Sequence, residues 1–203
     1  MRLFLIRHGE SVANVEKTFA GQVDSKLTEK GIEQAKSIRN ILERIPFDKV
    51  YSSDLSRAHD TQRYALPGVE AELTPLLREY DVGTWGGKPI AEAIEYEKLR
   101  KLDYAKFGGE SRSMVTVRVE KFLAMLEEDP CDYVAAFSHN GFILNLMEIV
   151  MNAKVDRDGL ASDNCAIHVF EFNGTGWRLL SWNYMRQVCD IAQRRNNKQG
   201  ILL

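Results

Sequence analysis

The sequence is short of cysteine, of net charge and of long apolar segments, and each shortage excludes a class of protein. Its three cysteines, Cys131, Cys165 and Cys189, are too few and too scattered for a disulfide framework or a zinc cluster. We interpret them as thiols of a reducing compartment. A formal net charge of -2 over 203 residues gives no electrostatic basis for non-specific binding to nucleic acid or to an anionic membrane.

Apolar runs are short along the whole chain. None approaches the roughly 20 residues that a membrane-spanning helix requires. The first run, residues 3–6, leads directly into Arg7 and lacks the longer apolar stretch and the cleavage site of a secretory signal. We therefore expect a cytoplasmic protein. With 44% apolar and 28% charged residues and no internal repeat, the chain is expected to form one domain over residues 1–203.

Strand-like and helix-like segments alternate along most of the chain. Strands are predicted at residues 3–6, 47–52, 70–73, 133–137, 165–172 and 177–182. Helices are predicted at 28–45 with Thr28 as its cap, from about 54, and at 91–104, 115–126 and 142–151. This order predicts an α/β fold, a three-layer α/β/α sandwich with a mixed, mainly parallel central sheet, in which the last two strands form an antiparallel hairpin.

Reactive polar side chains follow three of the predicted strands. Arg7 and His8 follow the first strand, Arg57 lies one helical turn beyond the second, and His139 follows residues 133–137. Because ligands of open α/β sheets bind beyond the carboxyl ends of the parallel strands, we expect these side chains to meet at one edge. Arginine matches phosphate oxygens with a rigid fork of donors, and neutral imidazole is a nucleophile toward phosphorus. The pattern predicts a phosphate-binding cup with a nucleophilic histidine.

A known family shows the same pattern. Arg7-His8-Gly9-Glu10-Ser11 resembles the Arg-His-Gly signature of the histidine phosphatase superfamily, also called phosphoglycerate mutase-like. The resemblance continues in order through Phe19-Ala20-Gly21, Asp24, Leu27-Thr28-Glu29-Lys30-Gly31, Ser52-Ser53-Asp54-Leu55-Ser56-Arg57-Ala58 with Thr61, Leu77-Arg78-Glu79 with Gly83, Trp85 and Gly87, and Ser138-His139. It covers nearly the whole chain.

The resemblance implies a role for each matching residue. His8 is expected to accept the phosphoryl group, and Glu79 to protonate the leaving oxygen and later accept a proton from water. The residues expected to hold the transferring group are Arg7, Arg57 and His139, with Asn14 and Gly21 as further candidates. The family commonly has glycine directly after the second histidine, whereas this chain has Asn140 and then Gly141. Asn140 either donates a hydrogen bond to substrate or turns the chain, and the sequence leaves both open.

Other polar residues receive structural interpretations. His59 and His168 are isolated histidines, which are more often structural than catalytic. Glu72, Asp81 and Glu110 are rival acids, but only Glu79 matches the family position. Ser111 is expected to cap the next helix, although it and Glu110 could also line the pocket.

The predicted function is that of a metal-independent phosphatase, a phosphoric monoester hydrolase of the histidine acid phosphatase type, with a phosphohistidine intermediate on His8 and no cofactor. The chain has no His-x-x-x-His and no Cys-x-x-Cys ligand spacing. Its acid segment, residues 79–83, lacks the arginine, histidine and tyrosine that the mutase branch carries as Glu-Arg-His-Tyr-Gly. Phosphoglycerate mutase-type transfer is therefore the alternative, and a non-catalytic phosphate-binding module is a third.

An insert at about residues 80–112 is expected to form a small helical cap that sets specificity. Its aromatic side chains either contact the alcohol portion of the substrate or pack as core; they are Trp85, Tyr96, Tyr104 and Phe107. The substrate is a small phosphomonoester, open among sugar phosphates, nucleotides, a cobalamin-pathway phosphate, phosphoglycerates and a phosphoamino acid. No nucleic acid or membrane partner is expected, and monomer and homodimer are both open.

Overall fold

The structure, a computed structural model, describes residues 1–94, 103–155, 160 and 162–183. Within these ranges six strands form one sheet in the order β3-β2-β4-β1-β5-β6. The strands are β1 (Arg2–Arg7), β2 (Lys49–Ser52), β3 (Glu72–Leu73), β4 (Tyr133–Ser138), β5 (Ile167–Phe172) and β6 (Trp177–Ser181). β3, β2, β4 and β1 are parallel to one another, β5 is antiparallel to β1, and β6 is antiparallel to β5. The mixed, mainly parallel sheet and its terminal hairpin are as predicted.

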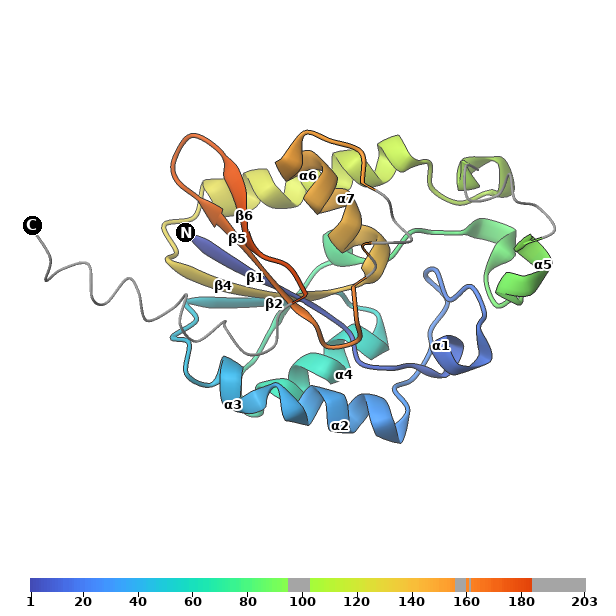
Figure 1. Ribbon diagram of the computed structural model, residues 1–203, viewed down its shortest axis with the longest axis horizontal. Coiled ribbons are helices and arrows are strands. Elements are labelled where there is room, and N and C mark those ends of the chain that lie inside the picture. The colour runs from blue at the N-terminus through green and yellow to red at the C-terminus, as the bar shows by residue number, and fades with distance from the viewer. Residues whose placement is uncertain (95–102, 156–159, 161, 184–203) are drawn as a thin grey trace, which may run out of the picture.

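Helices cover both faces of the sheet (Figure 1). The α-helices are α1 (Val12–Glu16), α2 (Glu29–Ser37), α3 (Arg39–Leu42), α4 (Ser56–Ala65), α5 (Ile90–Ile94), α6 (Arg112–Glu127) and α7 (Asn140–Met151). Short 3-10 helices are η1 (Pro75–Leu77), η2 (Gly83–Trp85) and η4 (Tyr104–Phe107). Helices α2, α3 and α4 lie on one face, and α6 and α7 lie on the other, which confirms the three layers.

Alternation along β1 explains why both faces are covered. Leu3 and Leu5 point into an apolar cluster with Phe122 of α6 and Phe142 of α7. Residues 4 and 6 of the same strand enter the second cluster, with the apolar side chains of α2 and α3. Since successive side chains of a strand point to opposite faces, a strand that is apolar at four positions in a row, as β1 is from Leu3 to Ile6, must be covered on both sides.

The predicted helix at 28–45 is broken in the structure. Thr28 caps α2 by accepting a hydrogen bond from the N–H of Gly31, but the chain turns at Ile38 and continues as α3. Ile38 is buried at 1% exposure, as is Leu42 at 0%. The apolar spacing runs on across the turn because both helices pack on the same cluster, so periodicity alone does not reveal the break.

Other elements differ from their predicted bounds at the ends. The second and third strands are shorter than predicted, at Lys49–Ser52 and Glu72–Leu73. Of the predicted helix at 91–104, α5 and η4 are described, and residues 95–102 lie outside the described residues, as does Cys189. No helix in the described part of the chain is long and apolar enough to cross a membrane.

Candidate active site

The carboxyl ends of β1, β4 and β2 lie side by side. Arg7 pairs in register with Ser138, and Ser52 pairs with Phe137. The ladder continues one residue further, because the N–H of His8 donates to the carbonyl of Ser138 at 3.0 Å. His8 and His139 therefore stand next to each other past their strands, with ring centroids 5.2 Å apart. The two histidines meet as the strand-end rule predicts.

His8 is held in one protonation and one tautomeric state. It is buried, with 4% exposure, and its pKa lies well below 6.5 because burial disfavours the imidazolium and because Arg57 and Arg7 place positive charge beside it. Its Nδ1 lies 2.7 Å from the carbonyl oxygen of Gly9, so Nδ1 carries the proton and donates. The lone pair is then on Nε2, which makes His8 a neutral nucleophile near neutral pH.

Arg7 and Arg57 each use some of their N–H donors to bind backbone carbonyls of neighbouring loops. The Nη1 and Nη2 of Arg57 donate to the carbonyls of Val23 at 3.1 Å and Gly21 at 2.6 Å. The Nη1 of Arg7 donates to the carbonyl of Ser162. Gly21, a candidate from the sequence, thus contacts Arg57 through its carbonyl.

Three buried nitrogens of these side chains have no hydrogen-bond partner among the described residues: Nε of Arg7, Nε of Arg57 and Nδ1 of His139. The other ring nitrogen of His139 lies 2.9 Å from Oγ of Ser53. That hydroxyl accepts the N–H of Leu55 at 3.3 Å, and His139 Nε2 is the acceptor that the contacts of the described residues offer for its own proton, which assigns the ring proton to Nδ1. All three nitrogens are then donors, and buried donors of this kind call for an acceptor.

The electrostatics of the cup also favour an anion. Burial lowers the pKa of Arg7 and of Arg57 below 12.5, and the charge of Glu79 counteracts this effect at both arginines. Burial and the neighbouring arginines lower the pKa of His139 well below 6.5, so that ring is neutral. Glu79 is the strongest negative charge at both arginines, and Asp163 adds to it at Arg7 and Asp24 at Arg57. The forked donors of the two guanidinium groups suit a phosphate dianion.

Glu79 is fixed by two backbone N–H groups. Its Oε1 accepts from Tyr80 at 2.9 Å and its Oε2 accepts from Gly141 at 3.0 Å, in the first turn of α7. A Cβ at position 141 would lie 2.2 Å from Oε1 of Glu79, so only glycine permits this approach. The carboxyl is therefore held by the first turn of α7, the helix for which His139 is the N-cap residue.

The two asparagine candidates are held by protein contacts. Asn14 accepts the N–H of Ser11 through Oδ1 at 3.0 Å. Asn140 accepts the N–H of Ser162 through Oδ1 at 2.9 Å. Since the carbonyl of Ser162 in turn accepts from Arg7, Asn140 supports the loop that holds Arg7.

The rival acids have other partners. Glu110 forms an ion pair with Arg118, and Oδ1 of Asp81 accepts the N–H of Gly83 at 2.8 Å. Glu72 is exposed on β3. Ser111 caps α6 by accepting the N–H of Met114, as predicted.

Sequence reasoning missed the residues that support the site from a distance. Ser162 binds Arg7 and also contacts buried His168, whose Nε2 lies 2.8 Å from Oγ of Ser162. Asn164 donates to the carbonyl of His8 at 3.0 Å. Neither serine nor asparagine stands in a motif, and more than 150 residues separate each from the arginine or histidine that it holds, so no spacing signal could have found them.

The described aromatic residues of the 80–112 segment pack as a small core. Trp85 makes edge-on contacts with Phe19 and Phe107, at ring-centroid distances of 6.0 and 5.9 Å, and Tyr104 packs edge-on against Tyr80 at 6.3 Å. Tyr96 lies outside the described residues. Of the two interpretations of these side chains, the packing one accounts for Trp85, Tyr104 and Phe107.

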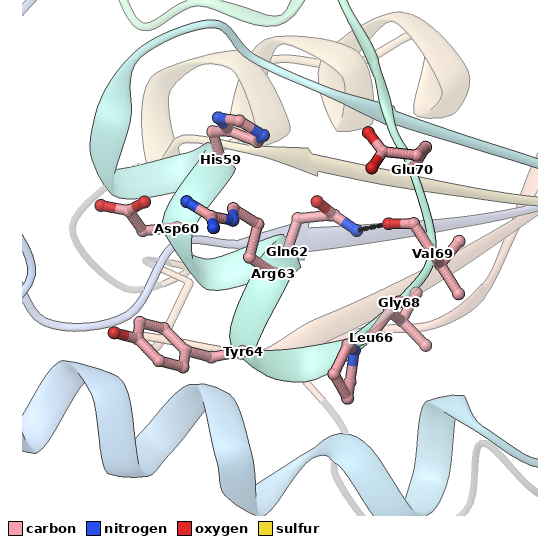
Figure 2. Close-up of a pocket in the computed structure, with 10 residues that line it drawn as sticks. His59, Asp60, Gln62, Arg63, Tyr64, Leu66, Gly68, Val69 and Glu70 are labelled. Atoms are coloured by element: carbon pink, nitrogen blue, oxygen red, sulfur yellow. Dashed lines mark hydrogen bonds between the residues drawn. The ribbon is translucent and has the colours of Figure 1, made fainter.

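A cavity of about 580 Å³ lies elsewhere, over the outer face of α4 (Figure 2). His59, Arg63 and Glu70 line it together with the turn that follows the helix. Arg57 and Thr61 of the same helix are buried on its inner face, so the cavity contains none of the candidate residues. The residues that the structure describes include no group of three histidine, cysteine or acidic side chains that could hold a metal ion.

Comparison with known proteins identifies the fold and then the family. The structure of a phosphoglycerate mutase from Bacillus anthracis matches with a TM-score of 0.78 at 20% identity, over 95% of this chain and 96% of that one, which shows a shared fold. A family model of the histidine phosphatase superfamily (branch 1) matches residues 3–185. The chain belongs to that superfamily.

Two curated relatives are phosphatases. The chain is 35% identical over 163 residues to the adenosylcobalamin/alpha-ribazole phosphatase of Salmonella typhimurium, a match that covers 72% of this chain and 77% of that protein. It is 34% identical over 159 residues to a broad-specificity phosphatase of Saccharomyces cerevisiae, covering 73% of this chain and 69% of that protein.

Proposed function

We propose that this protein is a phosphatase that hydrolyses small phosphomonoesters through a phosphohistidine on His8, without a metal ion or cofactor. The observation that carries the proposal is the set of buried donors on Arg7, Arg57 and His139, which have no partner among the described residues and surround a neutral imidazole. Three donors from separate elements match the three equatorial oxygens of a phosphoryl group in transfer.

The first chemical step follows from this geometry. Nε2 of His8 attacks phosphorus in line with the ester oxygen, the P–N bond forms as the P–O bond breaks, and Glu79 gives its proton to the departing alkoxide. The donors of Arg7, Arg57 and His139 stabilise the charge on the equatorial oxygens. Because the transition state is loose, positioning and charge supply most of the rate acceleration.

The second step returns the enzyme to its starting state. Glu79, now ionised, accepts a proton from water as the water oxygen attacks phosphorus. The P–N bond breaks, the electron pair returns to Nε2 of His8, and inorganic phosphate leaves. One group serves as acid and then as base, as microscopic reversibility requires.

The two phosphatase relatives are 35% and 34% identical to the chain, whereas relatives named as probable phosphoglycerate mutases are 28–29% identical over 90% of it, and the higher identity favours hydrolysis over mutase transfer. The residues after Glu79 agree with this choice. The hydroxyl of Tyr80 accepts a hydrogen bond from Asn145, and Asp81 is bound to Gly83 and Glu110. These two positions carry an arginine and a histidine in the mutase branch. We further propose that residues 80–112 form a cap insert of the single domain, and that the protein works in the cytoplasm.

Phosphate release from a panel of phosphomonoesters, including alpha-ribazole phosphate, sugar phosphates and phosphoglycerates, tests the proposal. Wild-type protein should release phosphate from one or a few compounds, and His8→Ala should abolish release. His59→Ala is the matched control, because His59 lines the cavity on the outer face of α4, and its activity should equal that of the wild type. Faster interconversion of 2- and 3-phosphoglycerate than phosphate release would favour a mutase, and no turnover at all would favour a binding module.

A further inference from the structure

The backbone around Glu79 has no regular structure of its own. Residues 78–82 lie between η1 and η2 and belong to no helix or strand. Buried backbone groups must still find hydrogen-bond partners, and here side chains supply several of them. The position of the Glu79 carboxyl therefore depends on what holds this segment.

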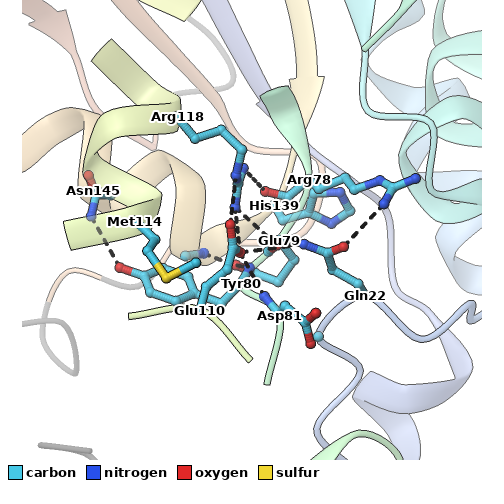
Figure 3. Close-up of polar contacts among 12 residues, drawn as sticks. Gln22, Arg78, Glu79, Tyr80, Asp81, Glu110, Met114, Arg118, His139 and Asn145 are labelled. Carbon is cyan, nitrogen blue, oxygen red and sulfur yellow. Dashed lines mark hydrogen bonds and ion pairs between the residues drawn. The ribbon is translucent and has the colours of Figure 1, made fainter. Parts of the chain in front are cut away.

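Arg118 of α6 binds the carbonyl side of the segment (Figure 3). Its Nη1 donates to the carbonyls of Leu76 at 2.9 Å and Arg78 at 2.7 Å, and its Nη2 donates to the carbonyl of Glu79 at 3.3 Å. One guanidinium group therefore binds three backbone carbonyl oxygens within residues 76–79. Arginine is suited to this because its donors are fixed in one plane.

Glu110 binds both Arg118 and the backbone on the other side of Glu79. Nε and Nη2 of Arg118 donate to its two carboxylate oxygens at 3.1 and 2.9 Å, in a two-point ion pair. Oε2 of Glu110 also accepts the N–H of Asp81 at 2.9 Å. The pair binds the carbonyls up to Glu79 and the N–H two residues after it. Both side chains are largely buried, at 13% and 16% exposure.

Gln22 links this pair to the phosphate cup. Its Nε2 donates to the carbonyl of Glu79 at 3.2 Å and to Glu110 at 3.4 Å. Gln22 lies between Gly21 and Val23, whose carbonyls accept from Arg57. The loop that fixes a phosphate-binding arginine and the segment that carries the acid are therefore parts of one hydrogen-bonded unit.

An ion pair this buried is a poor way to gain stability alone, since desolvation offsets much of its attraction and apolar replacements are often as stable. Besides pairing with Glu110, Arg118 donates three hydrogen bonds to the backbone segment that carries Glu79. We propose that Arg118, together with Glu110, is a positioning residue that holds the Glu79 carboxyl where it can protonate the leaving oxygen. The inference rests on the proposed function of this site and goes beyond it.

The proposal can be tested by varying the leaving group, because misplacing the acid should slow only those substrates whose leaving group needs a proton. An alkoxide must be protonated as it leaves, whereas 4-nitrophenolate departs without help. Arg118→Met should lower kcat/KM for a simple alkyl phosphate by about 100-fold, the cost of a displacement of about 1 Å. It should lower kcat/KM for 4-nitrophenyl phosphate by less than about tenfold and leave inhibition by inorganic phosphate nearly unchanged, because Arg57 keeps its own hydrogen bonds to the carbonyls of Gly21 and Val23. Arg118→Lys should recover part of the loss.

Two comparisons make the result specific. Arg112→Met removes another arginine from α6, one that pairs with Glu148, and should leave both rates near those of the wild type. Glu79→Gln should show the same selective loss, and adding Arg118→Met to it should have little further effect, since the two changes then disable one function. Where Arg118→Met fails to fold, Glu110→Gln, which weakens the same unit, takes its place.

The outcomes separate the two proposals. If Glu79→Gln loses activity selectively toward the alkyl phosphate but neither Arg118→Met nor Glu110→Gln does, the positioning role is wrong and the proposed function stands. An equal loss on both substrates for the Arg118 and Glu110 variants also overturns positioning. If Glu79→Gln itself shows no dependence on the leaving group, the role of Glu79 in the proposed function fails, and the inference fails with it.

Discussion

Three histidines are buried in the neutral state, and this makes the fold sensitive to mild acid. Burial lowers the pKa of His168 to about 3, and burial with the charges of Arg57 and Arg7 lowers the pKa of His8 and of His139 well below 6.5. Unfolding restores an ordinary pKa near 6.5 to each. Below pH 6.5 the unfolded chain binds protons that the folded chain does not, so stability is fully present above that pH and is lost as the pH falls toward the folded pKa values.

The size of the loss follows from linkage. Between pH 7.5 and 5.5 each such histidine removes about 1.4 kcal/mol from the free energy of unfolding, and three together remove about 4 kcal/mol. That is a large part of the roughly 5–15 kcal/mol of a typical domain. Carboxyls whose pKa is lowered by a hydrogen-bonded ion pair, such as Asp54 beside Arg78, also lose their contribution in acid, but only at lower pH, because an unfolded aspartate titrates near 3.8.

Urea unfolding at pH 7.5 and 5.5 measures this loss directly. His168→Asn provides the internal comparison, since His168 accepts the N–H of Asn183, contacts Ser162 and takes no part in the proposed chemistry. The variant should be less stable at pH 7.5 but should lose about one third less free energy between the two pH values. Equal stability of the wild type at both pH values would refute the conclusion that three histidines are buried in the neutral state. An undiminished loss of free energy in His168→Asn would show that His168 is not one of the histidines that cause it.

Two further predictions concern the site itself. Gly141→Ala should lower kcat/KM for alkyl phosphates at least about tenfold, because the added Cβ would lie 2.2 Å from Oε1 of Glu79 and 2.6 Å from Cδ2 of Tyr80; steady-state phosphate release checks this, and unchanged activity would mean that the carboxyl is free to move. Exhaustive chelation should leave the phosphatase rate unchanged in the same assay, and a complete loss that added metal reverses would contradict the mechanism.

The sequence predicted the elements whose causes are local. β1 and β4 are apolar at nearly every position, and a buried parallel sheet requires this pattern. Once these strands are placed, general rules for parallel sheets bring His8 and His139 together. The break at Ile38 was missed because the same apolar spacing serves both helices that it joins.

The supporting residues could not be predicted for a different reason. Arg118 stands eight residues after Glu110 on α6, a helix with one buried apolar face, where arginine ordinarily lies on the solvated face. Its acceptors are three backbone carbonyls and the carboxylate of Glu110, which only the folded chain brings within reach. Every residue type has a backbone carbonyl, so the residue types of the segment that Arg118 binds do not reveal the contact in the sequence.

The glycine after the second histidine shows how a sequence motif and a contact in the folded chain are related. The family commonly has glycine directly after that histidine, and here it comes one residue later, at Gly141. In the structure Gly141 contacts the acid: its N–H binds Oε2 of Glu79, and its bare Cα makes room for Oε1. Asn140 turns toward Ser162 and so toward the loop that holds Arg7. The first two residues of α7 therefore contact the two halves of the site: Gly141 contacts Glu79, the proposed proton donor, and Asn140 contacts the loop of Arg7, which we propose binds phosphate. A sequence motif read as one unit conceals that division.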